Sequence, residues 1–197
     1  YQSKQRSSKR LKNSHSNINK SRTRLMFSYG LGDAGTGLAA TQLGFYLFPF
    51  LIGHAGLSAL IAGSILMLIK VWDAINDPLI GWLSDKTNTK WGPRIPWMLI
   101  GAIPLGFTLA AIWWVPDGTL LQRTTYYVFI SILLMTAYTS VNLPFAALST
   151  ELSEEISIRT RLNASRFTGS IIAGLSGLII AANILSKNEI GYFTMGK

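Results

Sequence analysis

Long apolar runs alternate with short polar segments along most of the chain. Five of these runs reach a membrane-spanning length, namely residues 27–51, 58–83, 97–115, 125–148 and 167–186. A hydrocarbon core about 30 Å thick needs roughly 17 to 25 residues of helix to cross it. Because five such runs cannot form one soluble core, the pattern predicts an all-α polytopic membrane protein.

Small residues recur at helical spacing in the first and last of these runs. Gly30, Gly37 and Gly44 follow one another at intervals of seven residues, and therefore share one face of a helix. The last run repeats small residues four positions apart, in the pairs Ser170–Gly174 and Ala173–Gly177. Such spacing is typical of helices that pack closely inside a membrane.

Positive charge is concentrated at the predicted helix ends of one side. Of the lysines and arginines, fourteen lie in residues 1–26, 86–94 and 159–166, whereas Arg123, Lys187 and Lys197 flank the opposite ends. The positive-inside rule therefore predicts a cytoplasmic N-terminus. The net charge of +9 comes with no aromatic–basic platform, so we expect contact with anionic lipid and no nucleic-acid partner.

The two ends of the chain differ from its middle. Residues 1–24 are rich in Ser, Asn, Lys and Arg, and we expect a disordered cytoplasmic tail ahead of the helices in residues 25–197. A signal peptide is not expected, because residues 1–26 have no apolar core. The chain begins at Tyr1 and ends after a fifth predicted helix, so we expect a longer protein whose C-terminal remainder is absent here.

Lys70, Asp73 and Asp77 interrupt the second apolar run. Each charge costs roughly 2.5 to 3.5 kcal/mol near a bilayer centre on insertion scales. At about 100° per residue all three share one helix face, which must turn towards protein or water. Pro78 also frees the carbonyl of Ala74. These oxygens favour a small hard cation or a proton. A structural ion pair of Lys70 with either acid is the alternative.

Further polar positions outside the second run are open to more than one interpretation. Pro144 frees the carbonyl of Ser140, and this carbonyl, Thr139 and Asn142 could supply oxygen ligands if the fourth predicted helix faces the second. The same side chains could instead form ordinary interhelical hydrogen bonds. Asp33, near the start of the first helix, fits a site or a structural role equally. Arg166 could extend towards the membrane interface.

An intramembrane enzyme is not expected. His15 and His54 lie outside the predicted helices, and the chain has no cysteine, so disulfides and thiolate chemistry are excluded. Asp73 and Asp77 have neither a nucleophile nor a third metal ligand beside them. A non-transporting membrane scaffold would explain the glycines but not the paired acids.

Four motifs resemble those of the glycoside–pentoside–hexuronide:cation symporters, which include melibiose permease in the major facilitator superfamily. They are "YGLGDAGTGLA" at 29–39, "WDAINDPLIGW" at 72–82, "WGPRIPW" at 91–97 and "YTSVNLPF" at 138–145. The resemblance implies a fold of twelve helices in two halves, of which this chain supplies about five. It implies no cofactor, and Na⁺ or H⁺ as the coupling ion.

The resemblance also assigns roles to individual residues. Asp73 and Asp77 match the family's two cation-binding carboxylates, Thr139 matches a further cation ligand, and Lys70 falls where the family carries a basic charge partner. Arg166 matches an arginine near the sugar site, and we expect Asn142 and Asp33 to face the substrate cavity with it. Four further residues resemble the superfamily's cytoplasmic gating hairpin: Gly81, Asp85, Gly92 and Arg94.

Departures from the family pattern affect the sugar side of the site. A galactoside-binding aspartate of melibiose permease falls at Gly37, an acid becomes Asn142, and a tryptophan becomes Ala146. The resemblance thus implies cation-coupled symport of a small molecule, most simply a sugar or glycoside, with a lysolipid or other amphiphile as the alternative. We expect a monomer, when full length, in the plasma membrane.

Overall fold

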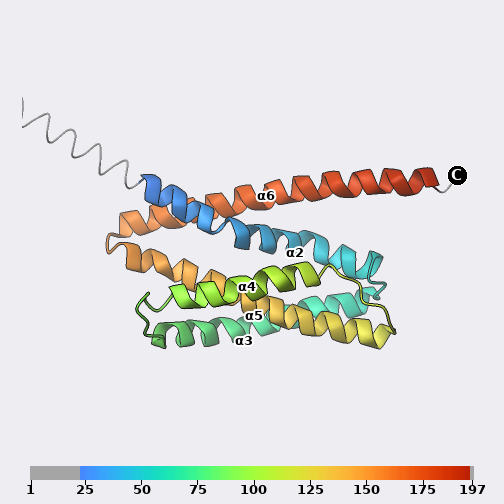
Figure 1. Cartoon of the computed structure of the whole chain (residues 1–197), viewed down its shortest axis with the longest axis horizontal. Coiled ribbons are helices and arrows are strands. Elements are labelled where there is room, and N and C mark those ends of the chain that lie inside the picture. The colour runs from blue at the N-terminus through green and yellow to red at the C-terminus, as the bar shows by residue number, and fades with distance from the viewer. Residues whose placement is uncertain (1–22, 196–197) are drawn as a thin grey trace, which may run out of the picture.

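The computed structural model describes residues 23–195, with side chains as far as Asn183. After a helical segment at 23–32, the elements are α2 (Ala34–Gly53), α3 (Ala59–Lys86), α4 (Ile95–Ala111), α5 (Leu120–Leu152) and α6 (Ile156–Met195) (Figure 1). Residues 23–195 contain no strand, so the predicted all-α class is confirmed. The tail expected at 1–24 lies outside the described residues except at Thr23 and Arg24, which are helical.

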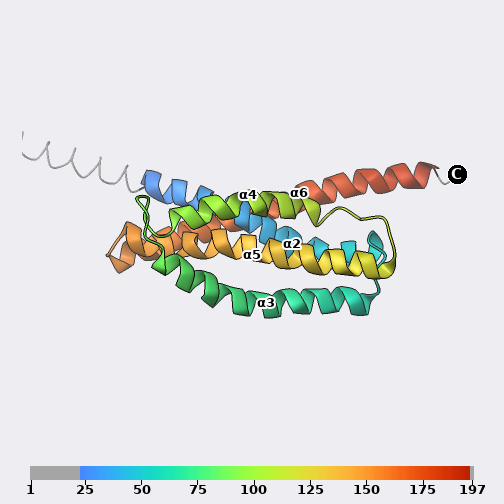
Figure 2. The same ribbon diagram turned by 60° about the horizontal axis from the view of Figure 1, so that its bottom comes forward.

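The helices form two closely packed groups. In the first, α5 packs against both α3 and α4, and in the second, α2 packs against α6. Figure 2 shows α3 on the side of the bundle away from α6, and in both views the C-terminal part of α6 extends beyond the other helices. The cation-site residues expected on α3 and α5 therefore lie on neighbouring helices.

Four helices are long and apolar enough to cross a membrane: 23–53, 59–86, 120–152 and 156–183. The expected fifth span at 97–115 is shorter, because α4 has only 17 residues and ends at Ala111. Pro116 favours an extended conformation at Val115, which stops the helix from continuing. Ile103 and Phe107 of α4 are nevertheless 80% and 74% exposed, as expected of side chains that face lipid.

Residues 149–165, which carry charges of both signs, are largely helical. α5 continues to Leu152 and α6 begins at Ile156, so that only residues 153–155 form the loop. Arg159 Nε donates a hydrogen bond to the Ser153 carbonyl oxygen at 2.6 Å. This backbone carbonyl, just beyond the end of α5, thereby has a hydrogen-bond partner. Because Glu and Arg favour helix, the charges of this segment extend the helices and do not break them.

Close packing of α6 against α2 and the helical segment at 23–32 depends on small residues. A Cβ atom at Gly37 would lie 2.6 Å from the Ser170 Cα, and one at Gly30 would lie 2.7 Å from the Ser165 carbonyl oxygen. The predicted glycine face thus contacts α6 at two of its three positions, whereas Gly44 has no atom within 4 Å of such a Cβ. Gly174 of the predicted α6 face lies against Thr41.

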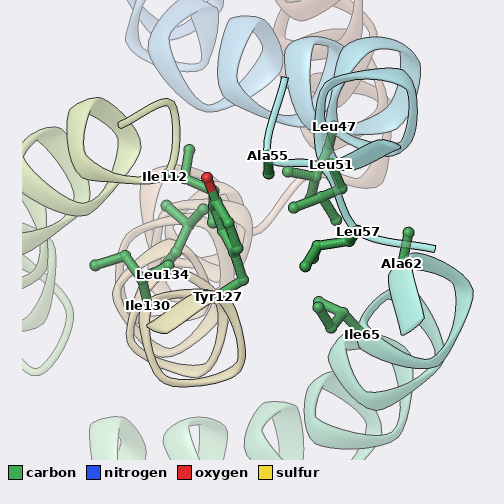
Figure 3. Close-up of a cluster of buried hydrophobic side chains, with 10 residues drawn as sticks. All are labelled: Leu47, Leu51, Ala55, Leu57, Ala62, Ile65, Ile112, Tyr127, Ile130 and Leu134. Carbon is green, nitrogen blue, oxygen red and sulfur yellow. The ribbon is translucent and has the colours of Figure 1, made fainter. Parts of the chain in front are cut away.

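A cluster of buried apolar side chains joins α2, α3, α4 and α5 at one end of the bundle (Figure 3). Arg123 Nη1 donates to the Ala55 carbonyl oxygen at 3.3 Å and ties the α2–α3 loop to α5 at the same end. The members of the cluster are Leu47, Leu51, Ala55, Leu57, Ala62, Ile65, Ile112, Tyr127, Ile130 and Leu134. This packing fixes the helices around the polar positions further along the bundle.

Candidate functional site

Asp77 of α3 and Thr139 of α5 meet at the centre of the candidate site. Thr139 Oγ1 donates a hydrogen bond to Asp77 Oδ1 at 3.1 Å. Thr139 is buried, whereas Asp77 is partly exposed. The hydroxyl oxygen keeps lone pairs when it donates this hydrogen bond, so the threonine and the carboxylate can supply oxygen ligands from both helices.

A cavity of about 470 Å³ lies beside this pair, between α2, α3 and α5. Its apolar wall includes Leu43 and Leu47 of α2 and Leu66 and Ile69 of α3. Its polar lining consists of Lys70, Asp73 and Asp77 from α3 and Ser131, Tyr138 and Asn142 from α5. The expected shared face of the three α3 charges therefore opens onto a cavity between the helices.

Lys70 does not form the structural ion pair that was the alternative to a cation site. In the described part of the chain no ion pair joins it to Asp73 or Asp77, and its side chain is exposed. Two carboxylates one helical turn apart therefore remain on the cavity wall without a direct cationic partner. A bound monovalent cation would offset the repulsion between them.

The register of α3 against α5 is fixed by a second contact that the sequence did not reveal. Trp72 Nε1 donates to Thr136 Oγ1 at 3.0 Å, close to one helical turn before the Asp77–Thr139 contact on both helices. Trp72 precedes Asp77 on α3, and Thr136 precedes Thr139 on α5. This order is expected when two neighbouring helices run in the same direction. The two hydrogen bonds together align Thr139 with Asp77.

Asp33 and Arg166 form a separate polar group. Asp33 Oδ2 lies 3.9 Å from Arg166 Nε, and the side chain of Asp33 is buried while that of Arg166 is partly buried. Thr36 Oγ1 donates to Asp33 Oδ1 at 2.7 Å, at the turn that separates residues 23–32 from α2. Arg166 Nε and Nη1 have no hydrogen-bond partner in the described structure. Neither Asp33 nor Arg166 lines the 470 Å³ cavity, so the expected substrate residues fall into two places, with Asn142 in the cavity.

The hairpin between α3 and α4 is held by Arg94. Its Nη2 lies 2.6 Å from Asp85 Oδ1, and its Nε donates to Glu151 Oε1 at 3.2 Å. Its Nη1 also donates to Ser84 Oγ at 3.1 Å. Gly92 has φ +85°, a conformation that favours glycine. A Cβ atom at Gly81 would lie 3.4 Å from Leu143 Cδ2 of α5, an ordinary van der Waals contact. Of these partners, Ser84 and Glu151 carry no sequence signal that would have identified them.

Replacing Arg94 with alanine should destabilise the hairpin more than an ordinary surface substitution. The change removes charge-assisted hydrogen bonds to three residues, and we expect a loss of about 1–3 kcal/mol. A thermal melt of the protein in detergent would measure this loss. Lys90→Ala, on the same hairpin but exposed, is the matched control and should leave the melting temperature unchanged. Equal effects of the two substitutions would contradict the role of Arg94.

A site for a multivalent metal is not seen among the described residues, which contain no group of three or more His, Cys, Asp or Glu side chains suited to it. The two α3 carboxylates with a threonine hydroxyl form a smaller set of hard oxygen donors. Such a set suits Na⁺, Li⁺ or a proton, as the sequence predicts.

Comparison with known proteins places the chain in a family. Residues 28–196 match the family model described as MFS/sugar transport protein. The chain is 42% identical over 179 residues to an uncharacterized symporter of Synechocystis sp., an alignment that covers 86% of the chain and 33% of that protein. It is 31% identical over 159 residues to a glucuronide carrier protein homolog of Escherichia coli, covering 80% and 34% of the two proteins.

A vertebrate protein has about the same sequence identity to the chain as the Escherichia coli protein. The sodium-dependent lysophosphatidylcholine symporter 1 of Gallus gallus is 32% identical over 160 residues, covering 81% of the chain and 30% of that protein. The chain thus spans about a third of the length of the curated relatives it matches. The resemblance read from its motifs is confirmed, and the chain belongs to the MFS/sugar transport protein family, a symporter family of the major facilitator superfamily.

Proposed function

We propose that the chain forms the cation-binding part of a secondary active transporter, which couples Na⁺ or H⁺ to the uptake of a sugar or glycoside by alternating access. The observation that carries this proposal is the Thr139–Asp77 hydrogen bond across α5 and α3, beside a cavity that Asp73 and Asp77 line. Relatives named as symporters support the transport class.

The cation occupies the space between Asp73, Asp77 and the Thr139 hydroxyl. Two carboxylates on one helix turn repel each other, so a bound cation stabilises both. The same cation contacts α3 and α5 and therefore favours one arrangement of these helices. Lys70 remains near the carboxylates as a mobile charge partner that can approach them once the cation leaves.

Substrate binding uses the polar part of the cavity wall. Asn142 supplies an amide that can both donate and accept hydrogen bonds, which suits the hydroxyl groups of a sugar. Asp33 and Arg166 form the second polar group, outside this cavity, and Arg166 Nη1, which has no hydrogen-bond partner, suits an acceptor atom of the substrate. Substrate and cation each favour the loaded arrangement, so each raises the affinity of the other by the same factor.

A Na⁺-coupled carrier of an amphiphile such as a lysolipid is the second candidate. The cavity is lined mainly by apolar side chains on α2 and α3, which suit an acyl chain better than a sugar. A relative in Gallus gallus is named as a lysophosphatidylcholine symporter. The positive residues at one side of the bundle support a cytoplasmic N-terminus in a plasma membrane for either substrate.

Uptake into proteoliposomes tests the function. The natural protein that contains this chain would be reconstituted, and the uptake of labelled sugars, glycosides and lysophosphatidylcholine would be measured with and without an inward Na⁺ or H⁺ gradient. We expect one substrate class to accumulate only with a gradient. If the uptake of every compound were the same with and without each gradient, cation symport would be contradicted.

Thr139→Val should weaken the cation site without destroying it. Valine keeps the shape of threonine but removes the hydroxyl ligand and the hydrogen bond to Asp77. The loss of one hydrogen bond to a charged group costs about 1.5–3 kcal/mol, so the Na⁺ concentration for half-maximal uptake should rise roughly 10- to 100-fold. Thr139→Ser keeps the hydroxyl and should stay within a few-fold of the wild type. Equal behaviour of the two variants would show that the hydroxyl is not a ligand.

A further inference from the structure

Trp72 of α3 and Thr136 of α5 form an interhelical hydrogen bond in which every group is neutral. Trp72 Nε1 donates to Thr136 Oγ1 at 3.0 Å. The Thr136 hydroxyl in turn donates to the Ile132 carbonyl oxygen at 2.8 Å, one turn earlier on α5. Because its own hydrogen is committed to α5, the Thr136 oxygen can only accept from α3, and an indole N–H can only donate. The bond is therefore directional and fits one alignment of the two helices.

Two side-chain hydrogen bonds join α3 to α5 among the described residues, and they respond differently to the state of the cation site. The bond from Thr139 ends on the Asp77 carboxylate, so it weakens when that carboxylate binds a proton. The bond from Trp72 to Thr136 involves no titratable group. It therefore holds the same alignment whether the site is empty, protonated or occupied by a metal cation.

Close packing of glycines does little to fix α3 against α5. On the other side of α5, a Cβ atom at Gly101 of α4 would lie 2.9 Å from the Ser140 Cβ, so α4 and α5 interlock. The glycines of α3 have no such contact. A Cβ at Gly81 would be in ordinary van der Waals contact with Leu143, and one at Gly63 would meet no atom within 4 Å. The directional hydrogen bonds therefore contribute more to the alignment of α3 with α5.

Alignment of the helices matters more for a metal cation than for a proton. A proton is held by one carboxylate oxygen of α3, wherever Thr139 lies. A metal cation needs several oxygen ligands at once, and metal–oxygen distances tolerate errors of only about 0.2 Å. A slip of α5 by one residue, about 1.5 Å along its axis, would carry Thr139 out of range, while Asp73 and Asp77 stay together on α3. Such a slip weakens the binding of Na⁺ selectively.

We propose that Trp72 is a positioning residue that raises the selectivity of the cation site for Na⁺ relative to H⁺, an inference that rests on the proposed function. Through Thr136 it holds α5 at the height where the Thr139 hydroxyl completes the ligand set of α3. Neither Trp72 nor Thr136 lines the cavity, so both act through the ligands. The cavity residues of α2 carry no titratable group, and those of α3 and α5 that do are Lys70, Asp73, Asp77 and Tyr138.

Calorimetric titration of the natural protein that contains this chain tests the role of Trp72. NaCl would be titrated against a choline chloride reference, from about pH 5 to about pH 8. The Kd at high pH reports the affinity for Na⁺, and the pH at which binding weakens reports the competing affinity for protons. In Trp72→Phe, which keeps an aromatic ring without a donor, we expect the Kd at high pH to rise about 3- to 10-fold.

The proton affinity of the site in Trp72→Phe should stay the same or rise. The carboxylates remain in place, and Asp77 loses a hydrogen bond that favours its charged form. The pH midpoint of Na⁺ binding should therefore not fall, and the number of Na⁺ ions bound per protein should not change. A general loss of folded protein would lower that number and leave the Kd unchanged.

Variants of Thr136 keep the test decisive if Trp72→Phe folds poorly. Thr136→Val removes the acceptor and keeps the side-chain shape, so it should raise the Kd for Na⁺ as Trp72→Phe does, with no further rise in the double variant. Thr136→Ser keeps the hydroxyl and should bind Na⁺ within about 2-fold of the wild type. Trp97→Phe is the matched control, because it removes an indole that donates to Thr87 Oγ1 at 2.8 Å in the α3–α4 hairpin. Its Kd for Na⁺ should equal that of the wild type.

Wild-type Na⁺ affinity in both Trp72→Phe and Thr136→Val would overturn the role of Trp72 and leave the symport function intact. An equal loss of Na⁺ and proton affinity in Trp72→Phe, or an equal loss of Na⁺ affinity in Trp97→Phe, would overturn it as well. A wild type without saturable Na⁺ binding would also overturn the role of Trp72. If uptake by that wild type showed no response to a H⁺ gradient either, the proposed function would fall with it.

Discussion

Asp77→Asn should abolish cation-driven uptake by the natural protein that contains this chain. Asparagine keeps the size of the side chain and an oxygen that can still accept the Thr139 hydrogen bond, but it has no charge to balance a dehydrated cation. Removing one partner of a buried charge pair costs about 3–5 kcal/mol, which corresponds to a loss of at least about 100-fold. Uptake into proteoliposomes under a Na⁺ or H⁺ gradient measures this directly.

Two comparisons make the Asp77 result specific. Asp117→Asn neutralises an exposed acid in the loop before α5 and should transport like the wild type. Exchange of labelled substrate for unlabelled substrate needs no net cation movement, so Asp77→Asn should retain part of it. Gradient-driven uptake that survives in Asp77→Asn at the wild-type rate would show that Asp77 does not bind the coupling ion.

Gly169→Val should prevent the correct packing of α6 against the segment that precedes α2. A Cβ at position 169 would lie 2.7 Å from the Gly30 carbonyl carbon and 3.2 Å from the Gly30 Cα. These are backbone atoms that cannot rotate away, so the helices must separate. Overpacking costs about 1–3 kcal/mol for small additions, and a branched side chain adds to this. Thermal melts and size-exclusion profiles in detergent should show a large loss of folded protein.

Gly63→Ala is the control for the helix-packing result. A Cβ at Gly63, inside α3, meets no described atom within 4 Å, and alanine favours helix over glycine by about 1 kcal/mol. The melting temperature of this variant should stay the same or rise slightly. If Gly63→Ala and Gly169→Val lowered stability equally, the loss would reflect general glycine requirements and not the contact of α6 with the segment that precedes α2.

The sequence predicted the helices well and their ends less well. Long apolar runs located each helix, because a helix that crosses a lipid bilayer must be apolar over its length. They could not locate the ends of α5 and α6, since Glu151 and Arg159 favour helix even where they leave the apolar region. They also predicted too late an end for α4, because the apolar residues after Ala111 form a turn and a non-helical segment before Pro116.

The charges of the candidate site were predicted from local spacing, whereas their partners were not. A helical period places Lys70, Asp73 and Asp77 on one face, and the structure places that face on a cavity. Contacts between helices depend on how α3 and α5 align, which no local pattern encodes. The Trp72–Thr136 hydrogen bond and the Glu151 partner of Arg94 were therefore not foreseen. For the same reason the sequence could not exclude the alternative, an ion pair of Lys70 with either acid.

Equilibrium binding of Na⁺ shows whether Asp73, Asp77 and Thr139 bind the coupling cation. Calorimetric titration of the purified natural protein with NaCl, against choline chloride as the reference, measures it without any assumption about the substrate. We expect saturable Na⁺ binding in the wild type and in Asp117→Asn, weaker binding in Thr139→Val and none in Asp77→Asn. Saturable Na⁺ binding of unchanged affinity in both Asp73→Asn and Asp77→Asn would contradict the account.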